Sequence, residues 1–162
     1  MHSITTLIQT QQTVFRYEQL ITLFSQHTKK ALTQFLYRAK QTGKLLNPQR
    51  GIWTLPVYDH FELASAFFPD GYISLESVLN TEGISFQWYG NTTTVISSKS
   101  ADIFYNGHHY IARKMKNTLL QNPLFVRTYE RYRKATVERA FCDMVYLRPK
   151  AHFDNPQYFQ NQ

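Results

Sequence analysis

The sequence has little cysteine, no long apolar segment and few acidic residues in its first third. Cys142 is the single cysteine, which excludes a framework of disulfide bonds. No apolar run approaches the length that spans a bilayer, and residues 1–13 are too polar for a secretory signal. These absences favour a cytoplasmic protein with no membrane association.

Motifs of catalysis are missing as well. The chain has neither a glycine-rich phosphate loop nor a Gly-x-Ser-x-Gly element. Glu138 and Asp143 lie five residues apart and do not share one helix face, so capping or a salt bridge with Arg139 or Arg148 is the expected role. Cys142 lies in an apolar helix pattern and is expected to be buried. We therefore expect no enzymatic activity, no catalytic residue and no cofactor.

The histidines do not have the spacing of metal ligands. His108 and His109 are adjacent in a predicted hairpin, so their side chains point to opposite faces and one ion cannot easily bind both. His60, His152 and Cys142 also lack zinc-ligand spacing. No metal site is expected.

The composition that remains is that of a folded protein with a basic segment. Of the 162 residues, 43% are hydrophobic and 18% charged, which is a globular balance, and the net charge is +7. Residues 1–56 contain seven basic side chains and one acid, Glu18, and so carry +6, whereas residues 57–126 carry −2 and residues 127–162 carry +3. A basic segment beside a near-neutral one is typical of a phosphate binder, and a solubilising basic face is the alternative.

The first third shows helical periodicity followed by a hairpin pattern. Residues 29–42 form the clearest helix, with an apolar stripe, Thr28 as its N-cap and Gly43 as the residue that ends it. Residues 14–17 are either a brief strand or the lead-in to a helix. The other expected elements are helices at 5–12 and 17–24 and strands at 44–46 and 52–55 joined by a turn at 47–51.

This order of elements predicts a winged helix-turn-helix in residues 1–56. The apolar stripe of the third helix would pack on the second helix and leave the opposite face free for the major groove of duplex DNA. Arg50, at the predicted hairpin tip, suits a contact with the backbone or the minor groove. A module that contacts only protein, through a winged helix that does not read DNA, is the alternative. The expected DNA-binding residues are Lys29, Lys30, Thr33, Gln34, Tyr37, Arg38 and Arg50.

Residues 57–162 predict a small mixed α/β domain, so that the whole chain belongs to the α+β class. Ser74 heads a capping pattern for a helix that runs to Thr81, and Asn106-Gly107 is a hairpin turn that favours positive φ. Residues 125–132 are either a strand or a loop. The remaining expected elements are helices at 59–68 and 136–147 and strands at 72–74, 92–98, 103–105 and 108–112.

Three stretches, in this order, make a more specific pattern. The first combines residues 28–32, Gly43-Lys44-Leu45 and residues 50–56; the second is residues 72–79 followed by Glu82-Gly83-Ile84; the third is residues 135–143. Together they resemble the AbiEi-type antitoxins of type IV toxin–antitoxin systems. The resemblance implies an N-terminal domain that represses its own operon by binding double-stranded promoter DNA at inverted repeats. It also implies a C-terminal part that counters a nucleotidyltransferase-like toxin without requiring stable contact.

A second basic cluster lies near the end of the chain. Contacts with flanking DNA, with RNA or with an acidic partner are all compatible with it, as is a solvated charged face. Its members are Arg127, Arg131, Arg133, Lys134 and Arg139, interleaved with Tyr129 and Tyr132.

Overall fold

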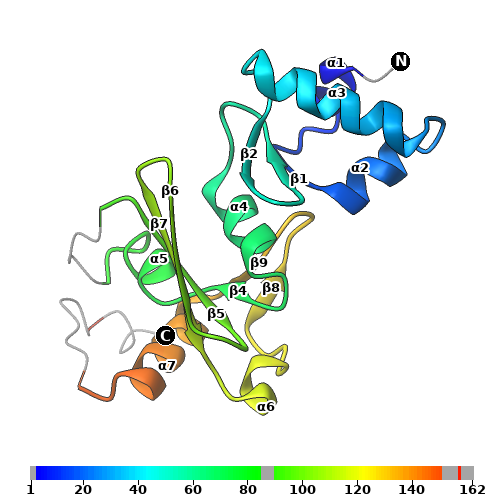
Figure 1. Cartoon of the computed structure of the whole chain (residues 1–162). Helices are drawn as coiled ribbons and strands as arrows, with labels where there is room; N and C mark the ends of the chain where they lie inside the picture. The colour runs from blue at the N-terminus through cyan, green and yellow to red at the C-terminus, as the bar shows by residue number, and fades with distance from the viewer. Residues whose placement is uncertain (1–2, 85–89, 151–156, 158–162) are drawn as a thin grey trace. The chain divides into compact units, whose positions relative to one another are not determined.

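The computed structural model describes residues 3–84, 90–150 and 157, and its elements are labelled in Figure 1. Within these residues the protein has seven helices and two sheets, which confirms the mixed α+β class. None of the described helices is long and apolar enough to cross a membrane. The chain divides into two compact units, the first ending at Ala66 and the second beginning at Phe67.

The first unit combines helices with a three-stranded antiparallel sheet of order β1-β3-β2. The segment that sequence left between strand and helix lead-in is strand β1. Eight buried apolar side chains from the helices and the sheet region form the core. The elements are α1 (Ile4–Gln9), β1 (Val14–Arg16), α2 (Tyr17–Leu23), α3 (Lys29–Gln41), β2 (Leu46–Gln49), β3 (Ile52–Thr54) and α4 (His60–Phe67).

Helix α3 forms where its local signals predict it. The Thr28 hydroxyl accepts a hydrogen bond from the backbone N–H of Ala31 at 3.2 Å, so the helix begins with a side-chain cap. After the helix, Gly43 has a φ of +68°, the left-handed conformation that favours glycine. Leu32 and Leu36 are buried on one side of the helix, and this fixes which side faces solvent.

The hairpin after α3 differs from its prediction. The turn was expected at residues 47–51, but β2 extends through Gln49 and only Arg50 and Gly51 separate the strands. Pro48 is tolerated inside β2 because β2 lies at the edge of the sheet, where a missing N–H donor costs little. Asn47 also closes the hairpin, since its side-chain amide donates to the carbonyl of Ile52 at 2.8 Å.

Helix α4 is tied to the first unit by a buried carboxylate. Glu62 is 6% exposed, and its Oε2 accepts hydrogen bonds from the backbone N–H groups of Thr13 and Val14 at 2.8 and 3.0 Å. The Thr13 hydroxyl donates to the same oxygen at 2.9 Å. The division in the structure therefore falls at the last residue of α4, between Ala66 and Phe67, whereas the sequence placed a boundary before this helix, at residue 56.

The second unit contains a six-stranded mixed sheet of order β6-β7-β5-β4-β9-β8. Strand β4 pairs with β5 antiparallel and with β9 parallel, and β5 pairs with β7 parallel. Helices α5 and α7 pack against each other. The elements are β4 (Tyr72–Ile73), α5 (Glu76–Leu79), β5 (Thr92–Ser97), β6 (Ala101–Tyr105), β7 (His108–Lys114), α6 (Asn117–Leu120), β8 (Val126–Thr128), β9 (Arg133–Ala135) and α7 (Val137–Leu147).

Local predictions in the second unit have mixed outcomes. The Asn106-Gly107 turn is confirmed, with φ values of 50° and 77°. The capping role of Ser74 is wrong, because α5 begins after Leu75 with no side-chain cap and ends at Leu79. The Ser74 hydroxyl instead donates to Asp143, and the segment left between strand and loop contains β8.

Candidate nucleic-acid interface

The exposed face of α3 carries every residue that the sequence assigned to it. The buried stripe occupies the opposite side of the helix, so the polar side chains project from the first unit. Tyr37 is the largest of these side chains and is 63% exposed. We call this surface the α3 face; its exposed members are Lys29, Lys30, Thr33, Gln34, Tyr37 and Arg38.

Helix α3 itself carries basic side chains and no acidic one. No acidic residue lies in the first turn of α3, where Lys29 and Lys30 are exposed beside the positive end of the helix. Lys40 and Lys44 are exposed further along and extend the positive charge, although the sequence did not include them among the expected contacts. Their charge was visible in the sequence, but their orientation required the fold.

Thr33 has less hydrogen-bonding freedom than the sequence suggested. Its hydroxyl donates to the backbone carbonyl of Lys29 at 2.9 Å, which leaves an acceptor oxygen and a methyl group for an external partner. The Tyr17 hydroxyl lies 3.5 Å from the same Thr33 oxygen. Tyr17, at the start of α2, therefore borders the α3 face and was missed because nothing local in the sequence links it to Thr33.

The hairpin between β2 and β3 presents Arg50 at its tip. Arg50 is exposed, and the next residue, Gly51, has a φ of +82° that closes the two-residue turn. The carbonyl of Gly51 accepts a hydrogen bond from the backbone N–H of Tyr17 at 2.8 Å. The hairpin tip and the start of α2 are therefore fixed to each other.

The second basic cluster is not a single surface. Arg133 donates through Nη2 to the carbonyl oxygens of Asp70 and Gly71 at 2.8 and 3.1 Å, and Arg139 is almost buried. Arg133 and Arg139 therefore do not belong to a solvated charged face, because their guanidinium groups donate to backbone carbonyls of the second unit. Arg127 and Lys134 instead occupy paired positions on β8 and β9.

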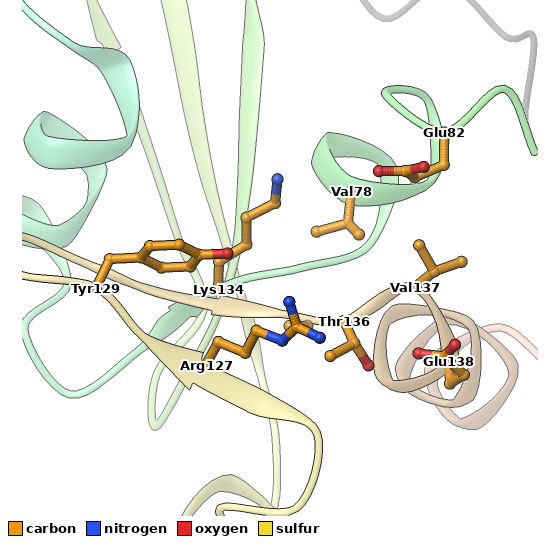
Figure 2. Close-up of a pocket in the computed structure, with 9 residues that line it drawn as sticks. Val78, Glu82, Arg127, Tyr129, Lys134, Thr136, Val137 and Glu138 are labelled. Carbon is orange, nitrogen blue, oxygen red and sulfur yellow. The ribbon is translucent and has the colours of Figure 1, made fainter.

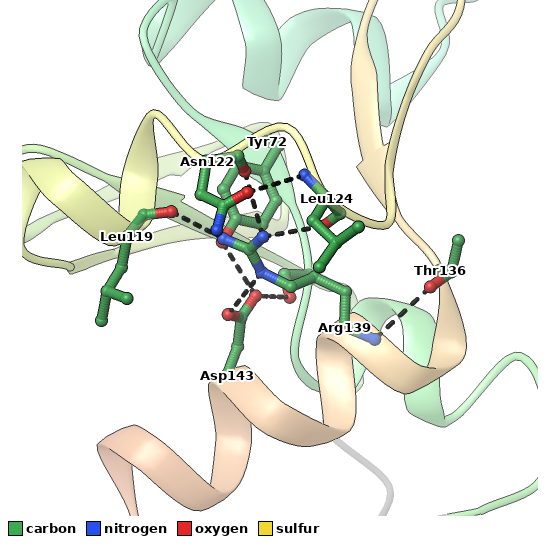
Figure 3. Close-up of polar contacts among 8 residues, drawn as sticks. Tyr72, Leu119, Asn122, Leu124, Thr136, Arg139 and Asp143 are labelled. Atoms are coloured by element: carbon green, nitrogen blue, oxygen red, sulfur yellow. Dashed lines mark hydrogen bonds and ion pairs between the residues drawn. The ribbon is translucent and has the colours of Figure 1, made fainter.

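Arg139 organises a polar network in the second unit, shown in Figure 3. Its guanidinium uses all of its nitrogens, and its side chain is 10% exposed. Nε donates to Asp143 Oδ1 at 3.0 Å, Nη1 to the carbonyls of Asn122 and Leu124 at 3.1 and 2.8 Å, and Nη2 to Tyr72 Oη and the Leu119 carbonyl, both at 2.8 Å.

Asp143 completes this network and has the salt-bridge role that the sequence expected for it. Its Oδ2 accepts from the hydroxyls of Tyr72 and Ser74 at 3.0 and 2.7 Å. Burial and the charge of Asp143 raise the pKa of the Tyr72 phenol well above its usual value. Burial opposes the charge of Arg139, but Tyr72 and Asp143 outweigh it and raise the pKa of that guanidinium. These polar groups satisfy one another, so the arrangement is structural.

The remaining reactive side chains are dispersed. Cys142 is exposed, so the prediction of a buried cysteine is wrong; Asp143 takes the inward position of α7 because it pairs with Arg139. His108 is buried with Nε2 2.8 Å from the Thr93 hydroxyl, and His152 lies outside the described residues. In the part of the chain that the structure covers, no three His, Cys, Asp or Glu side chains converge on a metal-sized site.

Comparison of the chain with protein-family models and with curated proteins finds no match. The chemistry of the α3 face is therefore judged from its own geometry. Exposed lysine and arginine side chains can contact phosphates, and the amide of Gln34 and the phenol of Tyr37 can reach the edges of bases.

Proposed function

We propose that the first unit is a winged helix that binds duplex DNA and that the chain is a transcriptional regulator. The order of elements supports this, since α2 and α3 are followed by the hairpin of β2 and β3. Strand β1 pairs with β3, which gives the hairpin a third strand within the unit. In this arrangement α3 is the recognition helix and the hairpin is the wing.

The α3 face is the observation that carries the proposal. Six polar or basic side chains are exposed together on the helix, with no acid in its first turn. A solvated helix surface normally mixes both signs of charge. Phosphate contacts by Lys29, Lys30 and Arg38 would supply most of the affinity, and Gln34 and Tyr37 would supply sequence preference.

The proposed biological role is that of the self-repressing antitoxin of a type IV system, acting against a nucleotidyltransferase-like toxin. The resemblance to AbiEi-type antitoxins motivates this role. Two of the resembling stretches, residues 72–79 and 135–143, come together in the second unit, where Tyr72 and Ser74 both bond to Asp143. Their convergence supports reading them as parts of one domain.

Titration of labelled duplexes by fluorescence anisotropy tests DNA binding. The probes are the DNA upstream of the coding sequence and a scrambled duplex of equal length. We expect Lys30→Ala and Arg50→Ala to weaken binding to both duplexes and to lower the salt slope by about 1 each, because each removes one phosphate contact. Gln34→Ala should reduce the preference for the upstream duplex instead. Lys116→Ala, an exposed lysine of the second unit, is the matched control.

Unchanged binding in all three variants would contradict the assignment of these surfaces. Absence of duplex binding, or binding that does not respond to salt, would favour an interaction module that meets an acidic protein. The antitoxin role has a separate test. If a neighbouring nucleotidyltransferase stops the growth of cells that express it, co-expression of this chain should restore that growth. Lys30→Ala should weaken repression of the chain's own promoter and still restore growth, since the antitoxin activity is assigned to the second unit.

A further inference from the structure

Two hydroxyl groups at the edge of the α3 face form a directed chain of hydrogen bonds. The Thr33 hydroxyl donates to the backbone carbonyl of Lys29 at 2.9 Å, and the Tyr17 hydroxyl lies 3.5 Å from the Thr33 oxygen. Because the proton of Thr33 is used in the shorter bond, Tyr17 is the donor in the longer one. The chain therefore runs from Tyr17 through Thr33 into the first turn of α3.

The direction of this chain decides what the two side chains offer to an external partner. Each hydroxyl has a single proton, and both protons point inward, so the pair presents acceptor oxygens and no donor. The hydrogen bond that Tyr17 donates also makes its own oxygen a stronger acceptor. Phosphate oxygens are acceptors themselves and do not suit this pair. A matching partner in DNA carries an N–H group.

Tyr17 is held in place by the fold of the first unit. Its backbone N–H donates to the Gly51 carbonyl at 2.8 Å, and its partly buried ring packs against the apolar core that includes Leu20 and Phe24. Thr33 lies on the exposed side of α3. The acceptor oxygen of Tyr17 is therefore preorganised beside the side chains that are proposed to enter the major groove.

We propose that Tyr17 determines base preference by accepting a hydrogen bond from an exocyclic amino group in the major groove, with Thr33 as its positioning residue. The inference rests on the proposed DNA binding. In the major groove only adenine and cytosine present an amino group, whereas guanine and thymine present acceptor oxygens that face the acceptors of this pair. Adenine N6 and cytosine N4 offer Tyr17 the same chemistry, and the experiment distinguishes them.

Duplexes with single modified bases test the proposal by fluorescence anisotropy. Each adenine of the upstream duplex is replaced in turn by N6-methyladenine, and each cytosine by N4-methylcytosine. In paired DNA the added methyl group takes the place of the amino hydrogen that faces the major groove. We expect a position at which this change weakens binding of the wild-type chain about fivefold, and the base at that position identifies the source.

Tyr17→Phe keeps the packed ring and removes only the acceptor oxygen. The variant should bind the unmodified duplex about fivefold more weakly than the wild type does. It should bind the modified and unmodified duplexes equally at the sensitive position, because the hydrogen bond that methylation blocks is already absent.

The positioning role of Thr33 has a readout of its own. Thr33→Val removes the acceptor for the Tyr17 proton, so the freed hydroxyl can donate, and thymine or guanine should be accepted at the same position. Thr33→Ser keeps the hydroxyl and should keep the wild-type preference. A merely structural role of Thr33 would change the affinity for all duplexes equally and leave the base preference as it is.

The polar cleft of the second unit supplies a control tyrosine. The cleft has a volume of about 260 Å³, and Arg127, Tyr129 and Glu138 are among its lining residues (Figure 2). Its charges are balanced within the cleft. A hydrogen bond with Thr136 lowers the pKa of the Glu138 carboxyl, and the charge of Arg127 lowers it further. Tyr129 is 45% exposed, so Tyr129→Phe removes an accessible hydroxyl that has no part in the proposed readout.

Thr22→Val is the matched control for Thr33→Val. The exposed Thr22 hydroxyl on α2 donates to the Glu18 carbonyl at 3.1 Å, the same local bond that Thr33 makes on α3. Both control variants should keep the wild-type base preference. A wild type without a sensitive position, sensitivity that persists in Tyr17→Phe, or equal losses in the controls would overturn this inference and leave DNA binding intact. Absence of binding to every duplex would instead overturn the proposed function, and this inference with it.

Discussion

Removing the charge of Asp143 should strongly destabilise the second unit. In Asp143→Asn the side chain keeps its volume, but Arg139 loses its only carboxylate partner in the network while it stays almost buried. In one orientation the new NH2 group faces the N–H of Arg139 Nε, so two donors meet. In the other orientation it faces the hydroxyls of Tyr72 and Ser74, which then lose the acceptor for their hydrogen bonds.

The magnitude follows from burial. The side chains of Arg139 and Asp143 are 10% and 5% exposed, and breaking such a pair by removing one charge costs about 3–5 kcal/mol. In a protein of this size that corresponds to a melting temperature lower by roughly 6–20 °C. Arg139→Lys should cost nearly as much, because an ammonium cannot reproduce five directed bonds to groups on different segments.

The same unit supplies a matched control. Arg113 and Asp102 form an ion pair at 3.6 Å with side chains 38% and 56% exposed, so Asp102→Asn should cost less than about 1 kcal/mol. Urea unfolding followed by circular dichroism gives both free energies, and amide hydrogen exchange locates the loss in β4 and α7. Equal losses in Asp143→Asn and Asp102→Asn, or a loss below 1 kcal/mol in Asp143→Asn, would refute the reasoning.

Three further outcomes are expected. Gly71→Ala should destabilise the second unit by about 2–4 kcal/mol in urea unfolding, because its Cβ would lie 2.5 Å from the carbonyl oxygen of Ile96, and backbone cannot move away cheaply. Glu62→Ala should lower the melting temperature of the first unit more than Glu62→Gln does, since glutamine keeps an acceptor for the Thr13 N–H; equal effects would contradict this. The raised pKa of Tyr72 means that the folded phenol stays protonated when the unfolded one ionises. The stability that this group contributes is therefore fully present below pH 10 and falls above it. When the free energy of unfolding is measured against pH, Tyr72→Phe should make its decrease above pH 10 less steep.

Features set by neighbouring residues could be predicted from the sequence. Thr28 and Gly43 mark the ends of α3, and the stripe that includes Leu32 and Leu36 fixes its buried side. The exposure of the α3 face then follows from helical geometry alone. The hydrogen bond that restricts Thr33 is also local. The sequence alone, however, does not distinguish a hydroxyl that donates to the Lys29 carbonyl from one that points outward.

Features set by distant residues could not be predicted. The sequence groups Arg139 with a basic cluster because its carbonyl partners, such as Leu119 and Leu124, come from a segment with no pattern that marks it as a neighbour. The sequence predicts a helix cap at Ser74 for the same reason, since the actual partner of this side chain, Asp143, lies 69 residues away. Both polar side chains point into the unit because each has a buried hydrogen-bond partner that is distant in the sequence.

The position of β4 bears on how the protein is made. β4 joins β5 to β9 in the sheet, yet β9 and α7 follow it by some 60 residues along the chain. The first unit closes with residues up to Ala66, so it is able to fold during synthesis while the second unit is still incomplete. Until β9 and Arg139 emerge, one edge of β4 has no partner, and this is the stage at which the nascent chain is most exposed to aggregation and to chaperones.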